Sequence, residues 1–151
     1  MRNSRHSEDS RLYFDWLEIA AQDLLAAQLL TEAGQCLEVA AFHCQQGMEK
    51  AFKAYLIYTG SGLPDGHNLT WLCRQAKKYD KGFHQWFDES ADLNQCYIET
   101  RYPADIEREY TYKMVRNFYR MAREMYQYIF AEIDREFDLR ERAEEEAPFN
   151  R

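Results

Sequence analysis

Two long segments of this chain carry the repeating pattern of an amphipathic helix. Their apolar side chains recur at alternating spacings of four and three, which places them on one helix face. The first set is Tyr13, Leu17, Ala20, Leu24 and Ala27, and the second is Met114, Phe118, Met121, Met125 and Tyr128. The 151 residues contain only six glycines and three prolines, so few tight turns interrupt the chain. The sequence therefore predicts an all-α fold built from long helices.

The turn signals between the apolar runs predict where these helices end. We expect helices over about residues 9–32, 36–59, 67–79, 90–99 and 107–138, and a helical turn over 83–88. A short connection at residues 33–36 would join the first two helices into an antiparallel hairpin. The predicted architecture is an antiparallel up-and-down bundle of four main helices plus a short helix. Residues 1–140 would form this single domain, and residues 141–151 a flexible acidic tail.

Composition and charge limit the partners that we expect. With 46% hydrophobic and 15% aromatic residues the chain can build an ordered core. A net charge of -7 is unlike that of a nonspecific nucleic-acid binder, so we expect no DNA partner. One local exception is the segment 74–81, which has four basic residues and one acid, whereas residues 132–146 have eight acids and three bases. Two solvated helix faces are the simpler interpretation, and a local basic site is the alternative.

The chain lacks the usual signals for a membrane or a metal. No stretch approaches the roughly 20 apolar residues that span a bilayer, and the polar N-terminus has no signal-peptide hydrophobic region. We therefore expect a cytoplasmic protein. The four cysteines are Cys36, Cys44, Cys73 and Cys96, and their spacing fits neither a C-x-x-C pair nor a zinc site. The sequence predicts reduced thiols, no metal site and no cofactor.

A row of polar residues runs along the predicted second helix. His43, Gln46, Lys50 and Lys53 follow one another at spacings of three or four and share a face, which we call the polar seam. An adjoining apolar stripe would pack against the bundle. The exposed part of the seam could then bind an anion.

Residues 41–56 resemble the HEPN domain family of small helical prokaryotic proteins when they are taken with two later elements. These elements are the His-x-Leu run at His67 and the Arg-Tyr-Pro turn that contains Arg101 and Tyr102. The family pattern has the same order: a long first helix, a second helix with a Gln-Gln-x-x-Glu-Lys-x-x-Lys-like run, the His-x-Leu element and the Arg-Tyr-Pro turn. Here it covers roughly residues 11 to 130.

The resemblance implies a homodimer that binds a nucleotide or another phosphate-bearing ligand and acts with a nucleotidyltransferase-like partner, as in a toxin-antitoxin module. Lys50, Lys53 and Arg101 would be the cations that contact phosphate. The ligand would be oriented by His43, Gln46, His67 and Tyr102. A simpler alternative is that Lys50 pairs with Glu49 or Glu99 and that Arg101 caps a helix end.

Many members of the family are metal-independent ribonucleases that carry an Arg followed, after four to six residues, by a His. This chain has no histidine after His84, so Arg101 and the later arginines lack that partner. We therefore expect a noncatalytic protein with no catalytic residues of this type. The alternatives are a ribonuclease toxin with a displaced histidine, His43 or His67, and a purely structural interaction module. Aromatic residues on the last helix could supply a dimer interface for such a module.

Overall fold

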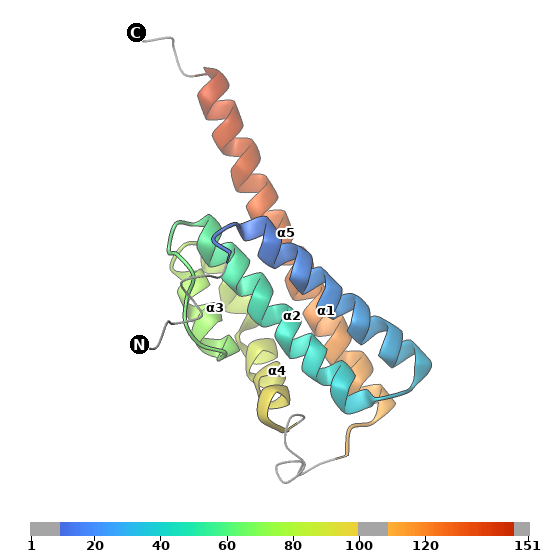
Figure 1. Ribbon diagram of the computed structural model, residues 1–151. Coiled ribbons are helices and arrows are strands. Elements are labelled where there is room, and N and C mark those ends of the chain that lie inside the picture. The colour runs from blue at the N-terminus through green and yellow to red at the C-terminus, as the bar shows by residue number, and fades with distance from the viewer. Residues whose placement is uncertain (1–9, 100–108, 147–151) are drawn as a thin grey trace, which may run out of the picture.

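The computed structural model describes residues 10–99 and 109–146 and confirms the predicted all-α fold. The elements are α1 (Tyr13–Ala33), α2 (Leu37–Tyr58), α3 (Leu69–Lys77), the 3-10 helix η2 (Lys81–Trp86), α4 (Phe87–Glu99) and α5 (Tyr112–Glu146). No strand occurs in these two ranges. The four main helices of the predicted bundle correspond to α1, α2, α4 and α5, and α3 is the short one (Figure 1).

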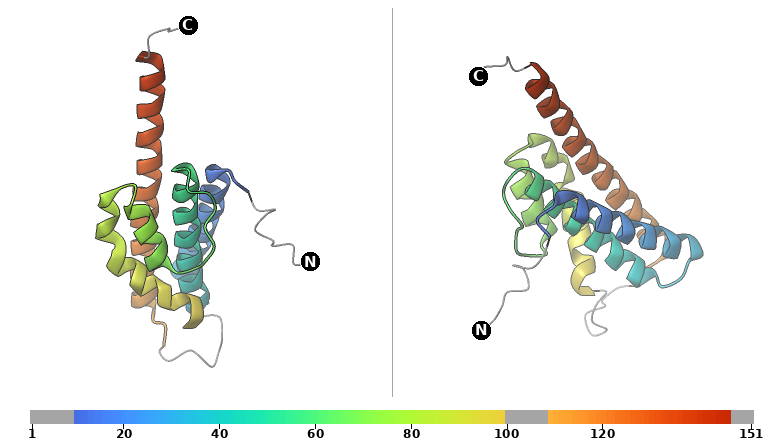
Figure 2. Two further views of the ribbon diagram at one scale, coloured as in Figure 1. Left: turned by 90° about the vertical axis from the view of Figure 1, so that its left-hand side faces the viewer. Right: turned by 45° about the horizontal axis from the view of Figure 1, so that its top comes forward.

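Helix α2 lies at the centre of the bundle. It packs against α1, α5, α3 and α4, and around it α1 contacts α5 and α3 contacts α4 (Figures 1 and 2). Its side chains Met48, Phe52 and Tyr55 are fully buried. Because α2 is covered on most of its circumference, a charged side chain on it needs a partner from a neighbouring helix or a path to solvent.

Small residues allow α1 and α2 to approach closely. Gly34 ends α1 in the left-handed conformation with φ of 64°, and the two N–H groups that follow the helix donate to the carbonyls of Leu30 and Thr31. A Cβ added at Gly47 would lie 3.1 Å from Cδ2 of Leu24. Gly47 therefore sets how closely α1 and α2 approach in the hairpin that carries the polar seam.

The limits of α5 differ most from those predicted. The helix begins at Tyr112 rather than near residue 107, because the Thr111 side chain accepts a hydrogen bond from the Met114 amide at 3.2 Å and caps the first turn. It continues to Glu146 and projects beyond the bundle (Figure 2). Residues 141–146 of the expected tail are therefore helical, and the flexibility of that tail stays a prediction.

Asp80 connects the turn between α3 and η2 to α5. Its carboxylate accepts hydrogen bonds from the Gly82 amide at 2.9 Å and from the Tyr128 hydroxyl at 2.8 Å. Burial alone would raise the pKa of Asp80, but these donors outweigh burial and hold its pKa below the ordinary value. Burial and the neighbouring carboxylate raise the pKa of Tyr128. The charged form of Asp80 therefore stabilises the packing of η2 on α5.

Candidate functional site

An acid on α1, Asp23, contacts two residues of the polar seam. Oδ1 of Asp23 lies 2.9 Å from Nδ1 of His43, and Oδ2 of Asp23 lies 2.6 Å from Nζ of Lys50. His43 and Lys50 are two turns apart on α2, so one carboxylate spans both. The side chain of Asp23 is 11% exposed, whereas those of His43 and Lys50 are 30% and 23% exposed. This Asp23 cluster is open to solvent on its basic side.

A second acid, Glu49 of α2, contacts Lys53 of the seam and His67. Its two carboxylate oxygens lie 2.6 Å from Nδ1 of His67 and 3.5 Å from Nζ of Lys53. The side chains of Glu49 and Lys53 are both 6% exposed, and the ammonium of Lys53 lies 5.8 Å from the ring centre of Trp16. Lys53 therefore faces the interior, whereas His67, which is 52% exposed, is the part of this Glu49 cluster that a ligand can reach.

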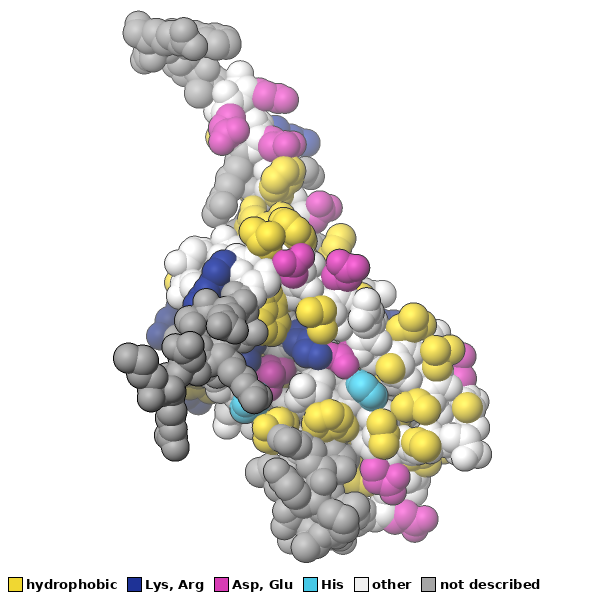
Figure 3. All heavy atoms as spheres, in the orientation of Figure 1, with side chains coloured by type: hydrophobic (Ala, Val, Ile, Leu, Met, Phe, Trp, Pro, Cys, Tyr) yellow, Lys and Arg dark blue, Asp and Glu magenta, His cyan; other side chains and the backbone are white. Residues whose placement is uncertain are grey.

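Two amide side chains and an aromatic ring surround His67 of the Glu49 cluster. Gln46 donates to the side-chain oxygen of Gln45 at 2.7 Å, and the buried Gln45 donates to the carbonyl of His67 at 3.3 Å. The ring of His67 stacks on Tyr97 of α4, with centres 5.1 Å apart and planes 13° apart. Figure 3 shows histidine, basic and acidic side chains beside one another on this face, between hydrophobic ones.

The structure thus brings together five of the seven predicted site residues. His43, Gln46, Lys50, Lys53 and His67 lie along one line on or beside α2, although only four of them reach solvent. Arg101 and Tyr102 lie outside the described residues.

The acids of the seam differ from those expected. The simpler alternative paired Lys50 with Glu49, but Lys50 pairs with Asp23, and Glu49 contacts Lys53 and His67 instead. Asp23 was not predicted to take part, although it had a recognisable signal: it interrupts the apolar face of α1 between Ala20 and Ala27.

The charges of the seam nearly cancel. Asp23 balances Lys50 and Glu49 balances Lys53, so any net positive charge on these six side chains depends on protonation of His43 and His67. Both imidazoles use Nδ1 for the carboxylate. Since a carboxylate on one ring nitrogen orients the ring, Nε2 is left as the donor or acceptor for a ligand. Among the described residues, no group of three His, Cys, Asp or Glu side chains is arranged to hold a metal ion.

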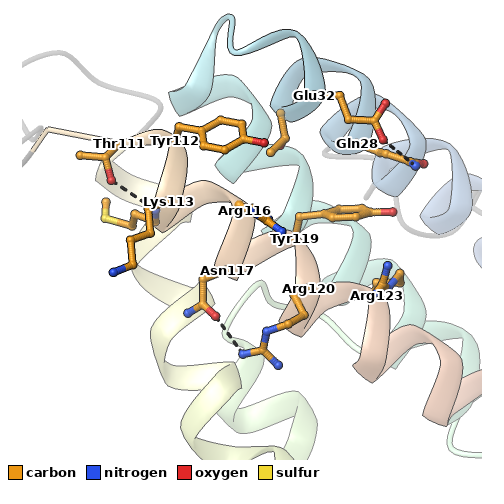
Figure 4. Close-up of a pocket in the computed structure, with 12 residues that line it drawn as sticks. Gln28, Glu32, Thr111, Tyr112, Lys113, Arg116, Asn117, Tyr119, Arg120 and Arg123 are labelled. Carbon is orange, nitrogen blue, oxygen red and sulfur yellow. Dashed lines mark hydrogen bonds between the residues drawn. The ribbon is translucent and has the colours of Figure 1, made fainter.

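A separate groove of about 830 Å³, the α1–α5 groove, lies between the end of α1 and the start of α5. Lys113, Arg116, Arg120 and Arg123 line it together with Glu32 and aromatic side chains, and no histidine is among its described lining residues. Figure 4 shows Arg120 turned toward Asn117, with which it makes a 2.8 Å hydrogen bond. Arg120 also pairs with Glu124 at 3.1 Å, so part of the positive charge here is already neutralised.

Comparison with known proteins agrees with this architecture. The fold and the seam define a small domain of bundled helices with an ionic network on its central hairpin. Residues 13–133 match the HEPN domain, and the chain belongs to the HEPN domain family. None of the helices in the described ranges combines the length and apolar character needed to span a membrane.

Two crystal structures resemble the chain over most of its length. TT1696 from Thermus thermophilus is 25% identical, with a TM-score of 0.72, and the match covers 79% of this chain and 96% of that one. ST0689, described as an archaeal HEPN homologue, is also 25% identical, with a TM-score of 0.66 and coverage of 81% and 98%. No curated protein matches the chain.

Proposed function

We propose that this HEPN protein is a noncatalytic, cytoplasmic homodimer whose polar seam binds a nucleotide or another phosphate-bearing ligand. It would act with a nucleotidyltransferase-like partner, in a module of the toxin-antitoxin type. The observation that supports the ligand is the open side of the Asp23 cluster, where one carboxylate holds both His43 and Lys50. The exposed ring of His67 belongs to the same polar face. Preorganised donors of this kind lose little entropy when they bind an anion.

Each seam residue has a part in this proposal. Lys50 and the Nε2 atoms of His43 and His67 would contact phosphate oxygens, and Gln46 would donate or accept beside them. One face of the His67 ring stacks on Tyr97, and in this proposal a base would stack on the other. Lys53 would act indirectly by holding Glu49, and Arg101 with Tyr102 would complete the site from the following loop.

Calorimetric titration of ATP and GTP at low and moderate salt tests the ligand. Saturable binding to the wild type should weaken in Lys50→Gln and in Arg101→Ala. Asp23→Asn is a more discriminating variant, because it removes the negative charge of the cluster and keeps His43 and Lys50. The carboxylate of Asp23 would repel a phosphate about 6 Å away by about 3 kcal/mol at an effective dielectric constant of about 20. Solvent screens part of this repulsion, so its removal should raise the affinity about tenfold. An unchanged affinity in Asp23→Asn would exclude the seam.

The partner and the dimer have their own tests. Light scattering during gel filtration should give twice the monomer mass of 18.1 kDa. A small nucleotidyltransferase encoded next to this protein should co-purify with it when the two are expressed together. A monomer, or the absence of such a complex with any neighbouring nucleotidyltransferase, would refute that part of the proposal.

Ribonuclease activity is a second candidate, and the His67–Glu49 contact favours it. An exposed histidine whose ring is oriented by a buried carboxylate through Nδ1 is a suitable general base. Incubation of RNA with the purified protein in the presence of a metal chelator tests this candidate. Cleavage by the wild type that His67→Asn abolishes would support it, and intact RNA would remove it.

A further inference from the structure

A second groove, of about 720 Å³, lies where α3 ends and η2 begins. It is lined by Arg74, Lys77, Lys78, Lys81 and His84, and we call it the α3–η2 groove. Arg74, Lys77 and Lys78 lie at the end of α3, and Lys81 and His84 lie in η2, so the groove gathers a row of basic side chains from both sides of the turn at Asp80. In a chain with a net charge of -7, this row is a local reversal of sign.

The positive charge of this row is not neutralised within the described part of the chain. The Lys and Arg side chains of the groove make no ion pair there, in contrast to Lys50 and Lys53 of the seam. The ammonium of Lys78 donates a hydrogen bond to the neutral side chain of Gln75, at 2.9 Å. Asp80, the one acid in this segment, is held by Gly82 and Tyr128 instead.

The end of α3 cannot account for four cations. A helix C-terminus carries a partial charge of about -0.5, which one basic residue satisfies. Lys77 also lies 5.7 Å from the ring centre of Phe87, a contact that places its ammonium without neutralising it. The groove therefore carries more positive charge than the end of α3 accounts for.

An aromatic side chain stands at one end of the row. Trp71 precedes Arg74 by one turn and Lys78 by two, so the three share a face of α3, and Trp71 is 39% exposed. Cationic side chains in line with an exposed aromatic ring are typical of surfaces that hold phosphates and stack a base.

We propose that the α3–η2 groove binds the phosphate groups of a nucleotide-bearing ligand, with Trp71 stacking on a base. The same chemistry occurs in a free nucleoside triphosphate and in a single strand of RNA. This site is independent of the polar seam, since α3 separates His67 at its start from the groove at its end.

Three probes distinguish a free nucleotide from a single strand of RNA as the ligand: ATP, a fluorescein-labelled single-stranded RNA oligonucleotide and inorganic pyrophosphate. Lys77→Gln/Lys81→Gln should weaken the binding of each probe. For RNA it should also lower the slope of log affinity against log salt by about 1.4, or about 0.7 for each lysine removed. Trp71→Leu should weaken ATP or RNA about tenfold and leave pyrophosphate unchanged. Tighter binding of RNA than of ATP identifies a strand as the ligand, and the reverse identifies a free nucleotide.

A matched control removes the same charge from the other basic groove. Lys113→Gln/Arg116→Gln should leave the affinities and the RNA salt slope within twofold of wild type, and Lys50→Gln should leave the RNA affinity unchanged even if it abolishes ATP binding at the seam. Equal losses in the control and the groove variant would overturn the proposal. So would the absence of binding by all three probes, or binding only of an acidic peptide that copies residues 134–146. Circular dichroism of each variant verifies that the changes at these surface positions leave the fold intact.

Discussion

The buried pair Glu49–Lys53 provides the strictest test of the seam's structure. Both side chains are 6% exposed, and their charged atoms are 3.5 Å apart. Glu49→Gln would leave the ammonium of Lys53 buried with no acid and would weaken the contact to His67. Removal of one partner of a buried pair costs about 3–5 kcal/mol, and the ring of Trp16 retains about 1 kcal/mol for the cation. We therefore expect the free energy of unfolding to fall by about 3 kcal/mol.

The reverse change should cost less. In Lys53→Met the carboxylate of Glu49 keeps His67 at 2.6 Å, so we expect a loss of about 2 kcal/mol. The double variant Glu49→Gln/Lys53→Met removes both charges together. Replacement of both members of a buried pair by neutral residues is close to neutral, so the double variant should be more stable than Glu49→Gln alone.

Urea unfolding followed by far-ultraviolet circular dichroism measures these differences. The surface pair Arg120–Glu124 is the control, because its side chains are 52% and 41% exposed and its atoms are 3.1 Å apart. Glu124→Gln should cost less than about 0.5 kcal/mol. If Glu49→Gln costs no more than this control, or if the two seam substitutions are simply additive, then Lys53 does not depend on Glu49 and our reading of the seam is wrong.

Three further predictions concern the connections of the bundle. A Cβ at Gly82 would overlap the Tyr128 hydroxyl, so Gly82→Ala should destabilise the protein by about 2 kcal/mol, and most of that loss should disappear in a Tyr128→Phe background when both are compared by thermal unfolding. Tyr128→Phe alone removes a donor to Asp80, whose pKa is lowered in the folded state. Stability from a depressed carboxyl pKa is present above the unfolded value of about 3.9 and is lost as the pH falls through the folded value. The variant should therefore lose about 1 kcal/mol near neutral pH and progressively less in acid, and urea midpoints that differ equally at both would contradict this. Gly34→Ala should cost about 1 kcal/mol in the same assay, because its φ of 64° strains any residue with a Cβ; an unchanged midpoint would refute the requirement for glycine.

The sequence by itself determined the helices and their order. Alternating spacings of three and four are a local property, so the pattern from Tyr13 to Ala27 was enough to predict α1, and Gly34 was enough to predict its end. The same periodicity places His43, Gln46 and Lys50 on one face of α2. The start of α5 depended on which residue caps it, and the capping residue is Thr111, whose side chain accepts from the Met114 amide.

Tertiary structure alone decided what these side chains contact. Asp23 pairs with Lys50 across 27 positions of sequence because α1 and α2 pack in one register, and no local pattern encodes the register of two helices. The packing of the helices also buries the side chain of Lys53, which pairs with Glu49. It joined Asp80 to Tyr128 on α5, so that no acid of residues 10–99 or 109–146 pairs with the lysines and the arginine of the α3–η2 groove. Spacing along one helix predicts which residues share a face, whereas their charge balance depends on the side chains that other helices bring within about 4 Å.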